Sequence, residues 1–417
     1  MNELTVDTER LIGELNELAT FSSCPEPVPA VTRVVFSEVD LKARSWLIGL
    51  FEQAGLAVHV DPIGNTYARW CPEGCDADAP AIGTGSHIDA IPHAGLYDGT
   101  VGVLGGLEAI RALQRAGHTP ARPIDVILFT SEEPTRFGLG CSGSRAMCGQ
   151  LTPDRLAQLK DETGSDLDSI RLDAGFAGSL EDVRLPDSAY AAFIELHIEQ
   201  GPQLEQEEID LAPVTAIAAP ATINFTIEGE GGHAGGVLMP DRKDAMCAAA
   251  SIISAIEQAA VTSESTDIVA TVGTLTIHPG AVNSIPSRVD FSLDLRDIDG
   301  GNRDTVLQTI LSSVVAIAEQ RSVEVSHYVL NSDPPATCDP HLVEALTHAA
   351  EAGGYSYKPM ISRAYHDSLF MATRFPTAML FIPCRGGVSH RPDEFAEPAH
   401  IEAGVATLAR TLASLSL

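Results

Sequence analysis

The stretch from Gly83 to Gly99 constrains the fold of this chain more than any other. It reads Gly-Thr-Gly-Ser-His-Ile-Asp-Ala-Ile-Pro-His-Ala-Gly-Leu-Tyr-Asp-Gly, and the apolar residues before it predict a buried strand that ends at His87. Residues Gly99 to Gly117 carry apolar side chains at helical spacing, and Asp98 lies on the loop between strand and helix. Open α/β sheets bind ligands at the carboxyl ends of their strands. We therefore expect an α/β fold with His87 and Asp98 at that edge.

Other predicted strands also deliver acidic or imidazole side chains. They are the apolar runs Ile124–Thr130, Ala191–Gly201 and Thr377–Pro383, which contain or precede Glu132, Glu133, His197 and His390. Carboxylates and imidazoles without an obvious thiolate favour a hard or borderline divalent ion such as Mn or Zn, and this many of them suit a two-metal centre. Any one of these side chains alone is better explained as a strand cap or a satisfied core group. Together with His87 and Asp98, around one sheet edge, they favour a metal site.

The adjacent residues Glu132 and Glu133 offer two roles, because neighbouring side chains at a strand end point in different directions. One carboxylate can bind metal while the other takes a proton from water as a general base. We assign the base to Glu132 and the ligand to Glu133. The sequence alone would equally allow the reverse.

A second domain is predicted within the 417 residues, a length that suits two domains. From Val214 to Leu330 the order is β-α-β-β-α-β, as in ferredoxin-like units: strand Ala221–Glu228, helix Asp241–Val261, strands Ile268–Ile277 and Arg288–Arg296, helix Asn302–Arg321 and strand Val323–Leu330. Its open sheet edge is free to pair with a second copy of the chain. We therefore divide the chain into residues 1–213, 214–330 and 331–417. The first and third form one α/β domain with a central mixed sheet, split around the second.

The charge balance excludes several classes of partner. The chain carries 57 acidic and 26 basic side chains, and its formal charge of -31 disfavours nucleic acid and anionic membranes. An anionic substrate would need a local cationic pocket. There is no run of about eighteen apolar residues, and Met1–Arg10 is polar and acidic rather than a secretory signal. We expect a cytoplasmic protein.

The eight cysteines are too few for a disulfide scaffold in a chain of this length. Only Cys71 and Cys75 lie close together, and we expect both to be free thiols. Half of a zinc site is the alternative, but no second Cys or His pair with suitable spacing follows.

Three polar residues of the second domain have both a functional and a structural explanation. His233 lies in a glycine-rich loop and could polarise a carbonyl group or simply follow a tight turn. Asn283 is a loop amide of a kind common in turns. Arg296 suits bidentate recognition of a carboxylate, and pairing with Asp294 or Asp297 would explain it as well.

Taken together, these motifs resemble the dinuclear-metal aminoacylase and carboxypeptidase superfamily. The resemblance is to its branch of allantoate amidohydrolases, N-carbamoyl-L-amino-acid hydrolases and ureidoglycolate amidohydrolases, and it covers nearly the whole chain. The motifs that carry it, in the family's order, are Gly85-Ser-His-Ile-Asp89, Tyr97-Asp-Gly99, Ser131-Glu-Glu133, Glu195-Leu-His-Ile-Glu-Gln-Gly201, Gly232-His-Ala-Gly235, Asn283-Ser-Ile-Pro286 and Ser389-His390.

The resemblance implies two divalent ions, Mn or Zn, in each subunit. One ion would be held by His87, Asp98 and His197, and the other by Asp98, Glu133 and His390, with Asp98 bridging. Glu132 would take the proton of the attacking water, and His233 would help to stabilise the oxyanion. The smaller domain would be the lid and dimerisation domain of a homodimer, in which the neighbouring lid supplies the residues that match His233, Asn283 and Arg296. The substrate pocket would also include Gln200, His366 and Gly387.

Within the branch, segments such as Thr130–Gly138 and Ile361–Ala372 look most like the ureidoglycolate amidohydrolases. Tyr365 stands where carbamoylases usually carry a small residue, which implies a smaller pocket that can hydrogen-bond a hydroxylated substrate. The loop Arg385–Val388 looks more like the carbamoylases.

The resemblance therefore implies hydrolysis of the carbamoyl C–N bond of a small anionic ureido acid. The expected substrate is (S)-ureidoglycolate, which would give glyoxylate, ammonia and carbon dioxide. Alternatives are an N-carbamoyl-L-amino acid, allantoate, or hydrolytic deamination of a related amine-bearing acid. A binding protein on an inactive fold is disfavoured, because such a protein has no need of the spare carboxylate Glu132 beside a full ligand set.

Overall fold

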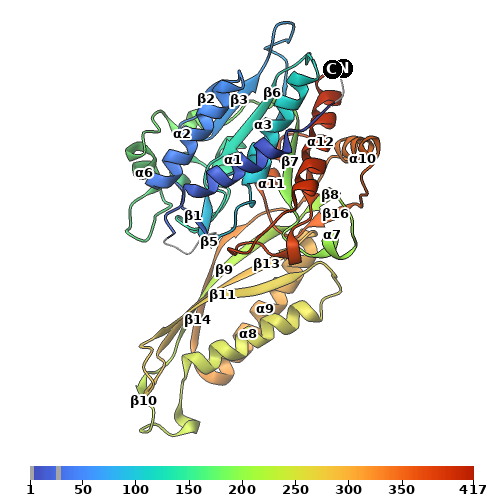
Figure 1. Ribbon diagram of the computed structural model, residues 1–417. Helices are drawn as coiled ribbons and strands as arrows, with labels where there is room; N and C mark the ends of the chain where they lie inside the picture. Colours follow the sequence, from blue (N-terminus) through green and yellow to red (C-terminus); the bar gives the residue numbers. More distant parts are fainter. Residues whose placement is uncertain (1–3, 25–29) are drawn as a thin grey trace. The chain divides into compact units, whose positions relative to one another are not determined.

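The computed structural model describes residues 4–24 and 30–417, which form two compact units (Figure 1). The larger unit comprises the described residues up to 216 together with 337–362 and 366–417, and the smaller one comprises 217–336 and 363–365. The expected α/β class is confirmed, because a mixed sheet with helices forms the larger unit and a separate antiparallel sheet forms the smaller. Of the acidic N-terminal stretch, residues 1–3 lie outside the described residues.

The larger unit is built on a mixed sheet with a parallel centre. Its strands are β2 (Ala57–Val60), β3 (Thr66–Trp70), β4 (Ala81–His87), β6 (Ile124–Phe129), β7 (Tyr190–Ile198), β8 (Ala212–Ile217), β15 (Ala336–Thr337), β16 (Met360–Ser362) and β17 (Thr377–Ile382), while β1 (Val31–Arg33) and β5 (Ala90–Ala94) form a separate pair. The central strands β17, β7, β4 and β6 pair in parallel in that order. Every residue of β6 and β17 is buried, which explains their continuous apolar sequences.

The larger unit also contains helices, several of which pack on this sheet (Figure 1). They are α1 (Thr8–Thr20), α2 (Glu38–Gln53), α3 (Thr100–Arg115), α4 (Ser142–Met147), α5 (Pro153–Leu156), α6 (Leu167–Asp173), α7 (Gln203–Gln206), α10 (Pro340–Gly353), α11 (Asp367–Met371) and α12 (Pro398–Leu415), with the short 3-10 helices η1 (Leu180–Val183) and η3 (Arg385–Gly387). Helix α3 packs on β4, β7 and α12. It approaches closely, because a Cβ built on Gly102 would lie 2.5 Å from the Leu196 carbonyl oxygen. No helix among the described residues is long and apolar enough to cross a membrane.

The smaller unit shows the predicted β-α-β-β-α-β succession. Its elements are β9 (Ala219–Glu228), α8 (Ala245–Val261), β11 (Val269–His278), β13 (Arg288–Asp297), α9 (Gly300–Arg321) and β14 (Glu324–Ser332), with the short strands β10 (Gly232–His233) and β12 (Ser284–Ile285) and the 3-10 helix η2 (Met239–Asp241). The strand order is β11-β13-β9-β14, all antiparallel. Alternate side chains enter one core under both helices, where the rings of Phe225 and Phe291 stack 4.9 Å apart.

The observed unit boundaries differ from the division at residues 214 and 331. Strand β8 continues to Ile217, because Val214 and its neighbours pair with β17 of the large sheet. Residues 363–365 return to the smaller unit, where Arg363 forms an ion pair of 2.7 Å with Asp267. Tyr365, expected in the third segment, therefore belongs to the smaller unit. Hydrophobic periodicity could not predict this, because a three-residue segment that belongs to the smaller unit is too short to show a period.

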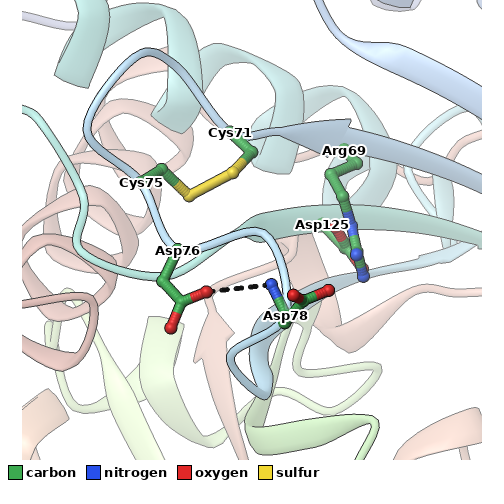
Figure 2. Close-up of a disulfide and its surroundings, with 6 residues drawn as sticks. All are labelled: Arg69, Cys71, Cys75, Asp76, Asp78 and Asp125. Atoms are coloured by element: carbon green, nitrogen blue, oxygen red, sulfur yellow. Dashed lines mark hydrogen bonds and ion pairs between the residues drawn. A yellow bond between two sulfur atoms is a disulfide. The ribbon is translucent and has the colours of Figure 1, made fainter.

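The expectation of free thiols at Cys71 and Cys75 is wrong, because these residues form a disulfide (Figure 2). They flank a turn in which the Cys75 N–H donates to the Pro72 carbonyl and Gly74 adopts a φ of 93°. The turn brings the two Cα atoms to 5.5 Å, a separation that a disulfide can span. Disulfides are rare in reducing compartments, so the cytoplasmic location stays a prediction.

Candidate metal centre

The parallel strands of the larger unit bring the predicted site residues to one edge of its sheet. In the register of the sheet His87 lies opposite Phe129 of β6, and His197 lies opposite Phe381 of β17. The loops that follow these strands therefore start at the same level. They carry Asp98, Glu132, Glu133 and His390.

Asp98 lies at the centre of the imidazole groups. Its Oδ1 is 3.2 Å from Nε2 of His197 and 3.6 Å from Nε2 of His87. Its Oδ2 is 3.0 Å from Nε2 of His390. The two oxygens of one carboxylate thus face two different sets of nitrogen donors, which is the arrangement a bridging ligand requires.

The adjacent glutamates diverge toward these two sets. Glu133 Oε1 lies 3.3 Å from Nε2 of His390, and Glu132 Oε2 lies 3.7 Å from Nε2 of His87. The donor atoms of His87, Asp98 and His197 lie within 4.8 Å of one another, and so do those of Asp98, Glu133 and His390. Glu132 stands beside these groups without belonging to either.

The buried histidines present Nε2 to the site. Nδ1 of His87 lies 2.9 Å from the Asp89 carbonyl oxygen, and Nδ1 of His197 lies 2.9 Å from the Ile198 carbonyl oxygen. A neutral ring that donates its Nδ1–H to a carbonyl keeps the Nε2 lone pair for a cation. Backbone carbonyls thus orient both rings, and the donor set of imidazole nitrogens and carboxylate oxygens fits Mn or Zn.

Two backbone features shape the site. Asp89, which is buried, accepts the N–H groups of Glu132 at 3.2 Å and Glu133 at 3.0 Å, and burial raises the pKa of Asp89 to about 6. Gly99 has a φ of 67°, and a Cβ there would lie 2.4 Å from Nε2 of His87. Only glycine fits at this position.

The side chains of the site shift one another's pKa values strongly. Although burial opposes it, hydrogen bonds from His197, His390 and His87 hold the pKa of Asp98 well below its usual range. Hydrogen bonds to Asp98 and Glu133 raise the pKa of His390 to about 11. Burial raises the pKa of Glu132 well above its usual range. A buried carboxyl with a raised pKa can accept and return protons, which a general base must do.

Three further predicted residues lie in the larger unit. Gln200 donates from Nε2 to Asp98 Oδ2 at 3.0 Å, while its own Oε1 is buried and has no hydrogen-bond partner among the described residues. The ring of His366 lies 4.4 Å from that of His197. Gly387, with a φ of 66°, packs its backbone against Pro202, since a Cβ there would meet the Pro202 nitrogen at 2.5 Å.

Four predicted residues lie in the smaller unit. His233 is exposed on the β10–β12 hairpin and Asn283 is exposed beside it. Arg296 donates twice to Asp294, at 2.7 and 3.0 Å, so the structural explanation for this arginine applies. Its guanidinium carbon also lies 5.2 Å from the ring centre of Tyr365, which brings these two predicted substrate residues together.

Sequence patterns missed several buried acidic residues around the site. Glu195 accepts the hydroxyl hydrogens of Ser86 and Ser368, both at 2.6 Å. Asp367 accepts the Ser144 hydroxyl at 2.5 Å. The available signal was an acidic residue inside an otherwise apolar buried strand, as with Glu195, because such a residue needs hydrogen-bond partners. Glu394, also missed, is treated below.

Comparison with known proteins decides the family. A family model described as Peptidase family M20/M25/M40 matches residues 83–414. The chain belongs to this family. Ureidoglycolate hydrolase of Oryza sativa subsp. japonica is 48% identical over 420 residues, covering 99% of this chain and 85% of the relative. Ureidoglycolate hydrolase of Arabidopsis thaliana is 47% identical over 423 residues, covering 100% of this chain and 88% of the relative.

Solved structures agree with the fold. Crystal structures of AtUAH in complex with glyoxylate and with (S)-hydroxyglycine each match with a TM-score of 0.93 at 46% identity, covering 99% of this chain and 98% of theirs. The family and fold expected from the sequence are thereby confirmed.

Proposed function

We propose that this protein is a metal-dependent ureidoglycolate hydrolase. The observation that carries the proposal is the convergence of His87, Asp98, Glu133, His197 and His390 around two adjoining donor sets, with Glu132 beside them. Ureidoglycolate hydrolases are 47% and 48% identical to nearly all of this chain, which supports the substrate. They agree with the expected enzyme class, a hydrolase of non-peptide carbon–nitrogen bonds.

The donor sets would hold two Mn or Zn ions, with Asp98 as the shared ligand. When bound, such ions lower the pKa of water and polarise the carbonyl group of a substrate. His87 and His197 would serve the first ion, and Glu133 and His390 the second. The backbone carbonyl groups that orient the His87 and His197 rings would hold the nitrogen donors in position before the ions bind.

Glu132 would act as the general base. Its buried carboxylate faces the donor set from the side of His87, at 3.7 Å, and its Oε1 accepts the Cys141 thiol hydrogen at 3.5 Å. It would take one proton from the attacking water and return it to the departing ammonia. One ureidoglycolate and one water then give one glyoxylate, one carbon dioxide and two ammonia molecules, which balances all atoms.

Substrate selection would depend on the remaining predicted residues. Gln200 has a buried amide oxygen for which the described part of the chain offers no partner, which suits an N–H of the substrate. In the smaller unit, Arg296 would attract the substrate carboxylate and Tyr365 would bond its hydroxyl group. Asn283 and His233 would act on the carbonyl oxygen, supplied by a neighbouring subunit's lid. His366 and Gly387 would line the pocket.

A homodimer through the smaller unit forms part of this proposal. Strand β11 is a sheet edge, and Val269 and Leu275 on it are 39% and 37% exposed. An edge of this kind can pair with its copy. Light scattering should give twice the chain mass of 44.1 kDa.

The decisive experiment is a substrate panel. The purified chain, loaded with Mn²⁺, is supplied with (S)-ureidoglycolate, allantoate and several N-carbamoyl-L-amino acids, and ammonia and glyoxylate are measured. We expect the highest kcat/KM with ureidoglycolate. Absence of turnover with every ureido acid would refute the proposed function.

Tyr365→Gly tests the specificity within the same panel. Removing the ring and hydroxyl should shift preference toward the bulkier carbamoyl amino acids. An unchanged profile would remove Tyr365 from the account of specificity while leaving the reaction class intact.

A further inference from the structure

We propose that Glu394 is a positioning residue that holds the Asp98 and His390 segments in place for the second metal ion. This inference rests on the proposed function. Glu394 lies four residues after His390 and is 3% exposed. Sequence patterns gave it no role, and its atoms do not belong to either donor set among the described residues.

The first contacts of Glu394 fix the segment that carries Asp98. Its Oε1 accepts the backbone N–H of Tyr97 at 2.8 Å and that of Asp98 at 3.1 Å. Two N–H groups on one carboxylate oxygen hold the Asp98 backbone in position, and hydrogen bonds to a charged acceptor are strong. The position of the bridging carboxylate therefore depends on Glu394.

Its other oxygen acts on the segment that carries His390. Glu394 Oε2 lies 3.0 Å from Oγ of Ser389, the residue directly before His390. That hydroxyl also lies 3.2 Å from Oδ2 of Asp98. Since a hydroxyl has one hydrogen, it can donate to one of these carboxylates at a time. Glu394 thus joins, through its two oxygens, segments that are almost 300 residues apart in the chain.

Packing against neighbouring residues restricts the position of the Glu394 side chain. A Cβ on Gly95 would lie 2.3 Å from Cβ of Glu394, so the Asp98 segment passes directly against this side chain. On the other side, the neighbouring Phe395 is held by Arg385, whose guanidinium carbon lies 4.0 Å from the ring centre. The side chain therefore has little freedom to leave its position.

A direct ligand role is a poor fit for Glu394. Oε1 is occupied by two N–H donors and Oε2 faces the Ser389 hydroxyl, so an ion would have to displace those bonds. Partners that orient metal ligands typically change metal affinity or activity by about 10- to 100-fold when they are removed. We expect an effect of that size at the ion next to His390.

The test compares Glu394→Ala, Glu394→Gln and a matched control in the full chain. The control is Glu397→Gln, an exposed carboxylate in the same loop that pairs with Arg385 at 2.7 Å. Bound Mn²⁺ is counted by equilibrium dialysis with elemental analysis, and electron paramagnetic resonance distinguishes a spin-coupled ion pair from isolated ions. Thermal melting of each variant without added metal shows whether it is folded.

Glu394→Ala should bind its second Mn²⁺ about 10- to 100-fold more weakly and lose the spin-coupled signal. Glu394→Gln should keep that signal, because its amide oxygen still accepts both N–H groups and its NH₂ can donate to Ser389. The Glu397→Gln control should match the wild type. A folded Glu394→Ala variant with two tightly bound, coupled ions would overturn the inference.

Ser389→Ala provides a second variant if Glu394→Ala does not fold. It removes the hydroxyl that joins Glu394 to the His390 segment and that also contacts Asp98 and Gln200. The N–H bonds to Glu394 Oε1 stay in place, so the variant should weaken the second ion more than the first. Unchanged binding of both ions by Ser389→Ala would then overturn the inference. A wild-type chain that binds fewer than two Mn²⁺ ions would instead count against the proposed function.

Discussion

Asp98 is the residue on which both donor sets depend. Its oxygens face His197 and His87 on one side and His390 on the other. Glu132, by contrast, lies next to the sets and belongs to neither. These two carboxylates of one site are therefore expected to respond to substitution in different ways.

Asp98→Ala should abolish binding of both ions and all activity, because no other carboxylate replaces the shared ligand. Glu132→Gln should keep both ions and lower kcat by about 10²- to 10⁴-fold, the usual contribution of a general base. Metal counting and ammonia release on the same samples check both outcomes. Loss of metal from Glu132→Gln would reverse the roles assigned to Glu132 and Glu133.

Metal affinity should rise with pH. Without metal, Asp98 and Glu133 raise the pKa of His390 to about 11, and the pKa values of His87 and His197 are also raised although burial opposes the shift. Protonated imidazoles do not bind cations, so binding must release protons, and each released proton makes the affinity tenfold higher per pH unit.

Titration calorimetry in buffers of different ionisation enthalpy measures this release. We expect at least one proton to leave when the site fills near pH 7. Mn²⁺ affinity that does not change from about pH 6 to about pH 8 would contradict the expected protonation of the empty site.

The grouping of the site residues was largely predictable at this scale, whereas the residues that hold them in place were not. His87, Glu133 and His390 could be predicted because strand ends concentrate ligands at one sheet edge. Glu394 could not be predicted, because it acts through hydrogen bonds from backbone N–H groups that lie nearly 300 residues away in the sequence. The Cys71–Cys75 disulfide was also missed, because the spacing of two cysteines in the sequence does not show whether the turn between them brings their Cα atoms close enough to bond.

At the scale of elements, the contact of α3 with the sheet depends on small residues. Gly102 faces the Leu196 carbonyl oxygen and Cβ of Ser86, which would lie 2.5 and 2.7 Å from an added Cβ. The backbone of α3 must therefore lie so close to β4 and β7 that no side chain fits between them at Gly102. The Gly99 N–H that points at His197 Nε2, 3.2 Å away, lies at the start of the same helix.

Gly102→Ala should destabilise the fold by about 1–3 kcal/mol through overpacking. Gly13→Ala is the matched control, because Gly13 lies in α1 with open space around its Cβ position. That change should stabilise the protein by about 0.5–1 kcal/mol. Denaturant unfolding of both variants measures the difference, and equal stabilities would show that α3 can move outward without cost.

Sequence periodicity predicted most elements to within a few residues. The differences lie at ends where a capping side chain decides the boundary, as where Asp244 accepts the Met246 and Cys247 N–H groups and starts α8 at Ala245 rather than Asp241. Short elements such as β16 were missed, since three residues carry no measurable period.

At the scale of the whole molecule, metal and stability are linked. The site holds several acidic side chains close together, and binding of Mn²⁺ by the native state alone stabilises it. Raising Mn²⁺ to one hundred times its Kd should add about 2.7 kcal/mol to the free energy of unfolding.

Unfolding of chelator-treated protein with and without added Mn²⁺ checks this value. Asp98→Ala should show no such gain. A similar gain in both proteins would mean that the ion binds elsewhere.

The split of the larger unit has a consequence for biosynthesis. A ribosome that has completed the smaller unit has made β7 but not β17, its parallel neighbour in the finished sheet. The apolar edge of β7 must therefore wait through more than 150 residues of synthesis before it is covered. His390 emerges later still, so a nascent chain that has not yet reached it cannot assemble the second donor set.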